Sequence, residues 1–242
     1  MAQVPEQYQG LRVVEQRGQR TQLIAPHSGG ELTFLHPPYG PDTYANVGLS
    51  IEKDGLEKAT MGETASLVHA TFNSPEDSRY RKEIEGIMQD RLLRAFTGII
   101  YVPRGAYIQD DPEIKDGMPF MEESGLERRL GSRQVGRVIY SDDGTVRFVP
   151  FGYKVGEMRP LELAKNTYVI GLAGEEGAEK LARVADKHRF NPFLFGYEFV
   201  GKPEARVSAL GSRGLGGRFF VVGNDYGGRG GRAFGVSEKT QK

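Results

Sequence analysis

Cysteine and tryptophan are both absent from the 242 residues of this chain. The lack of cysteine excludes disulfides, thiolate zinc sites, iron–sulfur clusters and a cysteine nucleophile, and it is typical of a reducing cytoplasm. No apolar run reaches the roughly 18 residues that span a membrane, and MAQVPEQYQG has neither the basic start nor the apolar centre of a secretory signal. We therefore expect a cytoplasmic protein with no membrane partner.

Signatures of the best-known active sites are missing as well. The segment GLAGEEGAEK lacks the Gly-Lys-Ser/Thr ending of a Walker loop, and Glu175 and Glu176 would repel a phosphate there. No Gly-x-Ser-x-Gly elbow provides a serine nucleophile. The histidines are too widely spaced to form a zinc-binding pair; they are His27, His36, His69 and His188. The sequence therefore predicts no metal and no cofactor.

Charge is balanced overall but unevenly distributed, with 32 basic and 32 acidic residues in total. From residue 201 onward, eight basic residues stand against three acidic ones. In SRGLGGRFFVVGNDYGGRGGRAFGV, arginines alternate with glycines and aromatic residues. Arginine pairs with phosphate and aromatic rings stack on unpaired bases, so this composition favours single-stranded nucleic acid as a partner. The predicted contacts are phosphate binding by Arg213, Arg218, Arg229 and Arg232 and stacking by Tyr226.

The same segment also has a purely structural interpretation. Its glycines would form hairpin turns, its phenylalanines would fill a core, and its arginines would pair with acids from the first 200 residues. The two interpretations differ in whether the guanidinium groups are free in solvent.

Helix-forming signals are concentrated in residues 42–97. Three helices are expected there: one capped by Asp42 and ended by Gly55, one opened by the capping box of Thr60 and Glu63, and one from Ser74 to Thr97.

Short strands and hairpins are expected in most of the remaining chain, because apolar runs alternate there with glycine-rich turns. Further helices are expected near 121–130, 159–165 and 175–188, hairpins at 98–109 and 135–151, and strands at 11–16, 21–25, 31–35, 167–174, 193–200, 205–210, 218–223 and 233–236. We predict a single α+β domain over residues 1–242, with a soft division near 131–134 and Arg/Gly-rich strands within 205–237.

The stretch FLHPPYG resembles the (Asp/Asn/Ser)-Pro-Pro-(Tyr/Phe) motif of amino-methyltransferases that modify adenine or cytosine in DNA. The resemblance implies that His36 holds the polar position and that Tyr39 stacks on a flipped base. It also implies cofactor-binding residues, for which Gly171, Gly174, Gly177 and Glu198 are the candidates. Histidine departs from the expected acid or amide, and the glycine spacing is wrong. In the structural alternative, the two prolines stiffen a turn before a capped helix.

A second enzyme interpretation rests on the acidic stretch IQDDPEIKDG. Carboxylates that follow a strand in a loop often take part in catalysis or metal binding, so Asp110 and Asp111 are candidates for a hydrolase.

Several stretches together are similar to an uncharacterised protein family found mainly in archaea. They are HPPYGPDTY, TASLVHATF, GLAGEEGAEKLARVADK, ARVSALGS and AFGV. This resemblance covers most of the chain after residue 35 and implies no particular activity, fold or ligand.

The interpretation that the sequence favours is a cytoplasmic binding or accessory protein whose C-terminal strands contact RNA or a ribonucleoprotein. The alternatives are an enzyme built around the His-Pro-Pro-Tyr loop and a structural subunit of a homo-oligomer.

Overall fold

The computed structural model describes residues 10–17, 19–213 and 217–240, and for residues 213 and 238–240 it describes the backbone alone. In this part of the chain there are six helices: α1 (Tyr44–Lys53), α2 (Met61–Phe72), α3 (Arg79–Asp90), α4 (Glu123–Arg129), α5 (Pro160–Lys165) and α6 (Thr167–Asp186). The strands are β1 (Arg12–Val14), β2 (Thr21–His27), β3 (Gly30–Asp42), β4 (Glu57–Lys58), β5 (Leu93–Val102), β6 (Gly105–Asp110), β7 (Ile114–Lys115), β8 (Met118–Pro119), β9 (Leu130–Val135), β10 (Val138–Ser141), β11 (Val146–Pro150), β12 (Gly156–Glu157), β13 (Phe190–Phe195), β14 (Glu204–Arg213), β15 (Arg218–Asp225) and β16 (Gly231–Thr240).

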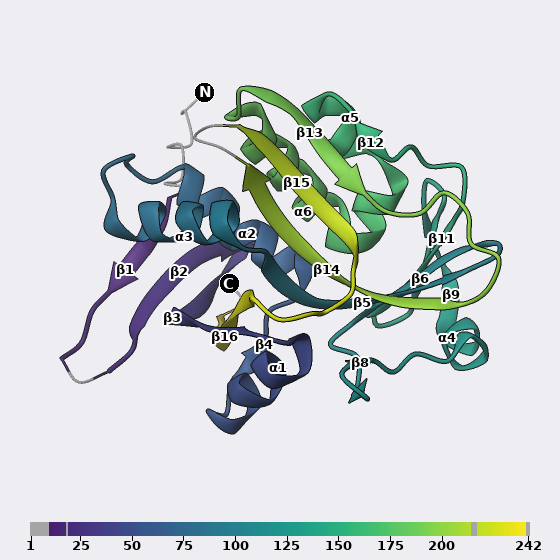
Figure 1. Ribbon diagram of the computed structural model, residues 1–242, viewed down its shortest axis with the longest axis horizontal. Coiled ribbons are helices and arrows are strands. Elements are labelled where there is room, and N and C mark those ends of the chain that lie inside the picture. Colours follow the sequence, from purple (N-terminus) through teal and green to yellow (C-terminus); the bar gives the residue numbers. More distant parts are fainter. Residues whose placement is uncertain (1–9, 18, 214–216, 241–242) are drawn as a thin grey trace, which may run out of the picture.

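Fourteen of these strands form a single mixed sheet. Its main path runs β1-β2-β3-β16-β5-β14-β15-β13-β12, and a branch continues from β5 through β6 and β11 to β10 and β9. The C-terminal β16 lies between β3 and β5, so the yellow end of the chain runs beside purple β3 (Figure 1). Strands β7 and β8 pair separately.

The prediction of an α+β protein with helices concentrated in residues 42–97 is wrong, because one large sheet dominates the fold. The third predicted helix is the first reason. It spans only α3, and residues 93–97 begin β5, in which every residue is buried. A strand covered on both faces has no alternation, and an apolar run of this kind cannot be told from a helix by its periodicity.

The second reason lies in residues 167–174, for which the sequence predicts a strand and which instead form the first half of α6. The Asn166 side chain accepts hydrogen bonds from the amides of Tyr168 and Val169, so it caps this helix. Gly174, with a φ of 74°, places a kink between the two halves. Helix α6 is therefore 20 residues long, and the longest helix in the described part of the chain lies outside residues 42–97.

Other local predictions are confirmed. Thr60 and Glu63 form the expected capping box of α2. The hairpins β5–β6 and β10–β11 are present, and so is α4.

Two further local predictions need correction. The cap of α1 is Thr43 rather than Asp42. The soft division predicted near 131–134 falls inside β9.

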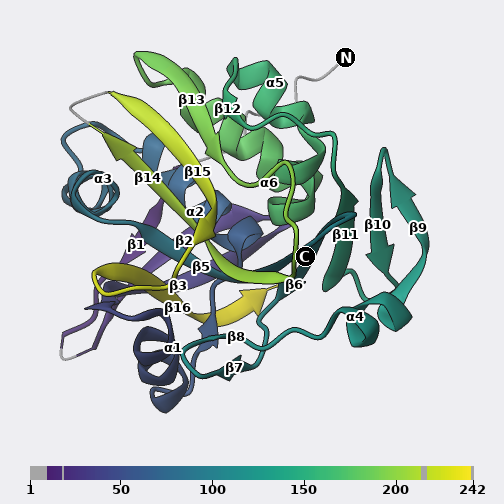
Figure 2. The same ribbon diagram turned by 45° about the vertical axis from the view of Figure 1, so that its right-hand side comes forward.

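The long helix α6 packs on α2, α5, β11 and β15. Two glycines permit this close packing: a Cβ on Gly171 would lie 2.4 Å from Val149 Cγ2, and one on Gly177 would lie 2.8 Å from Ala173 Cβ, with Gly62 Cα of α2 3.4 Å away. In Figure 1 α6 lies behind β13 and β15, and in Figure 2 β9 to β11 and α4 form a separate flank at the right of the view. Within the described ranges, no helix has the length and apolar character needed to cross a membrane.

Candidate nucleic-acid interface

The two faces of β15 have different surroundings. Phe219 is fully buried, and its ring centroid lies 5.5 Å from that of His188 beyond the end of α6. The next side chain points to the opposite face, where the Phe220 ring meets Phe195 of β13 at 5.4 Å and 74°. Phe193 continues this row 4.5 Å from Phe195. The face of β13 and β15 turned away from α6 therefore carries a row of aromatic rings.

A cleft of about 790 Å³, which we call the aromatic cleft, opens beside this row. Large side chains that line it include Arg91, Phe195, Phe220, Val222, Tyr226 and Arg229. Tyr226 is 68% exposed, and the Arg206 guanidinium covers one face of its ring at 4.2 Å. The rest of the ring is available to a planar ligand. Phe195 is also exposed, at 37%.

The glycine loop (residues 227–231) forms one wall of this cleft. Arg94 is only 3% exposed and anchors the loop, since it pairs with Asp225 at 2.9 Å and donates to the Gly228 carbonyl at 2.6 Å. A Cβ on Gly231 would lie 2.5 Å from the Arg94 guanidinium, so glycine is required at that position. The alternation of arginine and glycine therefore reflects an ordered loop wrapped around a buried cation. This loop directs Arg229 into solvent.

The five predicted nucleic-acid contacts have different environments. Arg218 pairs with Glu157 at 2.6 Å. Arg229 is exposed and forms no ion pair with a described residue, although it contributes, less than the Thr43 amide and Asn46, to a lowered pKa of Asp42. Arg232 donates to the Gly40 carbonyl at 3.0 Å and lines a different cleft. The side chain of Arg213 lies outside the described part of the structure.

Sequence reasoning missed Arg91, Arg94 and the aromatic row on β13. Arg91 is exposed, follows α3 and lines the aromatic cleft. The expectation of a helix that continues through Thr97 conceals both arginines within that helix. The available signal was the spacing of Phe193 and Phe195, which places both rings on one face of a strand.

A second cleft, which we call the basic cleft, has a volume of about 960 Å³ and is formed by the His-Pro-Pro-Tyr segment and α3. Its charged and titratable lining residues are Arg20, His36, Arg79, Lys82, Glu83, Asp90, Arg91 and Arg232. His36 is 8% exposed, and its Nε2 lies 2.6 Å from Glu83 Oε2. Burial lowers the pKa of His36, although Glu83 opposes this effect.

Tyr39, the predicted stacking residue of the methyltransferase interpretation, does not face this cleft. It is 9% exposed, donates a hydrogen bond to Asp54, and has the Arg20 guanidinium 4.3 Å above its ring. Burial, together with the bond to Asp54, raises the pKa of Tyr39 to about 12. Its ring is therefore occupied by contacts within the protein.

The predicted cofactor glycines have other roles. All three glycines lie within α6. Gly171 and Gly177 permit close packing, and Gly174 forms the kink. Glu198 accepts a hydrogen bond from the Val155 amide at 3.2 Å.

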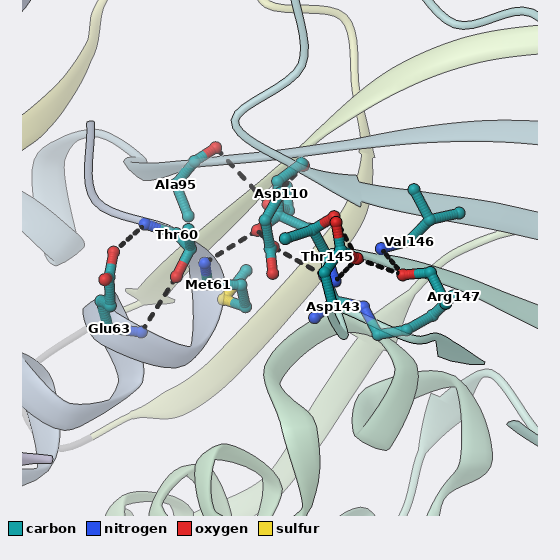
Figure 3. Close-up of polar contacts among 12 residues, drawn as sticks. Thr60, Met61, Glu63, Ala95, Asp110, Asp143, Thr145, Val146 and Arg147 are labelled. Carbon is teal, nitrogen blue, oxygen red and sulfur yellow. Dashed lines mark hydrogen bonds and ion pairs between the residues drawn. The ribbon is translucent and has the colours of Figure 1, made fainter. Parts of the chain in front are cut away.

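Asp110 and Asp111 belong to structural ion pairs. Asp110 Oδ1 lies 2.6 Å from both Thr97 Oγ1 and Arg147, and Thr97 in turn accepts from the Met61 amide (Figure 3). Asp111 pairs with Lys58 at 2.9 Å. Neither aspartate lines the aromatic or the basic cleft, so His36, Tyr39 and the two carboxylates do not converge on either. The groups named by the enzyme interpretations are thus dispersed.

The mixed, sheet-rich architecture resembles the C-type lectin fold. One solved structure that matches is described as "Accommodation of massive sequence variation in Nanoarchaeota by the C-type lectin fold". It aligns with 82% of this chain and 95% of its own, with a TM-score of 0.53 and 16% sequence identity. No protein-family model and no curated protein matches the chain. The likeness concerns the fold alone, and the resemblance to a mainly archaeal family stays a prediction.

Proposed function

We propose that this protein is a cytoplasmic accessory factor that binds single-stranded RNA through the aromatic cleft. The observation that carries the proposal is the position of Tyr226, whose largely exposed ring stands in one cleft with Arg91 and Arg229. Neither arginine forms an ion pair within the described residues, so both guanidinium groups are free to contact phosphates.

The chemistry of the cleft suits unpaired bases. Stacking of one base on one aromatic side chain contributes about 1–3 kcal/mol and tolerates every base, because each has a π face. Phe195 and Phe220 extend the stacking surface beyond Tyr226. The bases of a duplex are already stacked on one another, so single strands are expected to bind better.

The fold does not specify this ligand, because one fold supports many functions. In the structural neighbour, the C-type lectin fold is described as accommodating massive sequence variation. A scaffold that tolerates variation can carry surfaces of different chemistry, and in this chain the surface is aromatic and basic. The cytoplasmic location is supported by the absence of cysteine.

The test is a fluorescence anisotropy titration of labelled single-stranded RNA at low and moderate salt. Tyr226→Ala is expected to weaken binding roughly 5- to 150-fold, which corresponds to the loss of one stacking contact of about 1–3 kcal/mol. Tyr226→Phe keeps the ring and should bind nearly as wild type. Arg229→Gln should reduce the slope of log K against log salt by about 0.7, as expected for one lost phosphate contact.

Phe199→Ala is the matched control, because Phe199 is 72% exposed but lines neither cleft. It should leave the affinity unchanged. The absence of binding at low salt, or an equal loss in Phe199→Ala and Tyr226→Ala, would refute the proposal. Binding to duplex RNA with the same affinity would contradict the stacking mechanism.

A further inference from the structure

The basic cleft carries positive charge that the protein does not neutralise. Lys82, Arg91 and Arg232 line it and form no ion pair with any residue in the described ranges. The other two lining cations are engaged, since Arg79 pairs with Glu83 at 2.8 Å and Arg20 pairs with Asp54 at 3.3 Å.

Two acids line the same cleft, and they do not balance these cations. Glu83 is shared between Arg79 and His36, and these partners lower its pKa even though burial raises it, so the carboxylate stays ionised and occupied. Asp90 is exposed at the end of α3. Three free cations therefore face one free carboxylate, and the cleft favours an anionic ligand.

The walls of the basic cleft suit a sugar–phosphate backbone better than bases. Pro37, Pro38 and Pro41 form part of its lining, and proline has no backbone N–H to donate. Its described lining includes no large hydrophobic side chain that is exposed, in contrast to the aromatic cleft. Recognition there depends on the long cationic side chains, which contact phosphates without reading sequence.

The two clefts adjoin at Arg91. This residue and Asp90 line both of them, and a Cβ on Gly230 of the glycine loop would lie 3.3 Å from Arg91 Nη1. The loop also links Arg229, in the aromatic cleft, to Arg232, in the basic cleft. A chain of phosphates leaving the aromatic cleft along Arg91 therefore meets the next free cations in the basic cleft.

We infer that the basic cleft is the second half of an RNA path, in which Lys82, Arg91 and Arg232 hold the phosphates of nucleotides that follow those stacked on Tyr226. This inference rests on the proposed function. It adds a route for the bound strand, from the aromatic cleft past Arg91 into the basic cleft, and it predicts that the bound segment is longer than the aromatic cleft alone can hold.

The test compares two RNAs of about 4 and about 16 nucleotides, the range of site sizes found for single-strand binding folds. The double variant Lys82→Gln/Arg232→Gln should bind the short RNA as wild type does. For the long RNA, the slope of log K against log salt should fall by about 1.4, or about 0.7 for each lost contact. Lys165→Gln/Lys202→Gln removes two exposed cations outside both clefts and should change neither slope.

The outcomes separate the inference from the proposed function. If the short RNA binds in a Tyr226-dependent manner but the long RNA keeps its wild-type salt slope in the double variant, the second half of the path does not exist and the proposed function stands. An equal reduction of slope in the control double variant would also overturn the inference, because it would indicate diffuse electrostatics. If neither RNA binds, both proposals fail. Circular dichroism of each variant verifies that the fold is intact.

Discussion

His69 is a buried, titratable residue whose environment opposes protonation. It lies on α2 with 7% exposure, and its Nε2 is 3.1 Å from the side-chain amide of Asn73. Burial lowers the pKa of His69 to about 4, and the nearby cations of α6, Lys180 foremost, contribute to this lowering. The folded protein therefore requires the neutral imidazole at this position.

The resulting pH dependence has a definite sign. The ordinary pKa of 6.5 lies above that of the folded state, so the unfolded chain binds more protons as the pH falls. The contribution of the neutral His69 to the free energy of unfolding is complete above pH 6.5 and is lost as the pH falls through 4. Each unit of difference between the pKa values of the folded and unfolded states corresponds to at most roughly 1.4 kcal/mol. His69→Gln cannot be protonated, so the variant should gain stability relative to wild type between pH 7 and pH 5. Urea unfolding at both pH values measures this difference, and an identical difference at both would contradict the assignment.

At the scale of single elements, two glycines in helices provide opposite expectations. A Cβ on Gly171 of α6 would lie 2.4 Å from Val149 Cγ2 and 2.9 Å from Ile108 Cδ1. Overpacking of this kind costs more than the helix propensity gained, so Gly171→Ala should lower the free energy of unfolding by roughly 1–2 kcal/mol. Gly86 of α3 has open space at its Cβ position, so Gly86→Ala should raise the free energy of unfolding by up to about 1 kcal/mol. Chemical denaturation measures both, and stabilisation by Gly171→Ala would show that the α6 interface is loose.

Local signals predict helix starts unevenly: the start of α2 is predicted correctly, whereas the helix expected to start at Ser74 begins at Arg79, after the cap residue Ser78. The capping box of α2 fixes its start through two hydrogen bonds between neighbouring residues. By contrast, β5 and the first half of α6 are apolar runs whose state depends on burial by partners far away in the chain. Composition identified the arginine- and glycine-rich segment as unusual. It could not show that Arg94, more than 130 residues from the glycine loop, organises that loop.

At the scale of the whole molecule, the free cations come from widely separated parts of the sequence. Lys82 and Arg91 belong to α3 and the residue after it, whereas Arg229 and Arg232 come from the glycine loop and β16. The sheet brings them together because β16 pairs with β3 and also contacts β5 directly after α3. The excess of basic residues near the C-terminus therefore accounts only for Arg229 and Arg232. The fold adds Lys82 and Arg91, which the uneven charge distribution of the sequence does not reveal.

The position of β16 makes the C-terminal strand essential for the sheet. It pairs with β3 from Gly231 opposite Asp42 to Thr240 opposite Glu31, and Phe234 packs edge-on against Phe34 at 6.3 Å. Without β16, the β1–β3 part of the sheet loses its strand connection to β5.

Deletion of residues 231–242 should therefore abolish the single cooperative thermal transition. In the full chain, Phe234→Ala should lower the free energy of unfolding by roughly 3–5 kcal/mol. Deletion of residues 1–14 is the control, because β1 is an edge strand paired with β2, and it should preserve one transition. Differential scanning calorimetry distinguishes the cases, and a cooperative transition at the wild-type temperature after loss of β16 would show that the two parts of the sheet are held together by the helices instead.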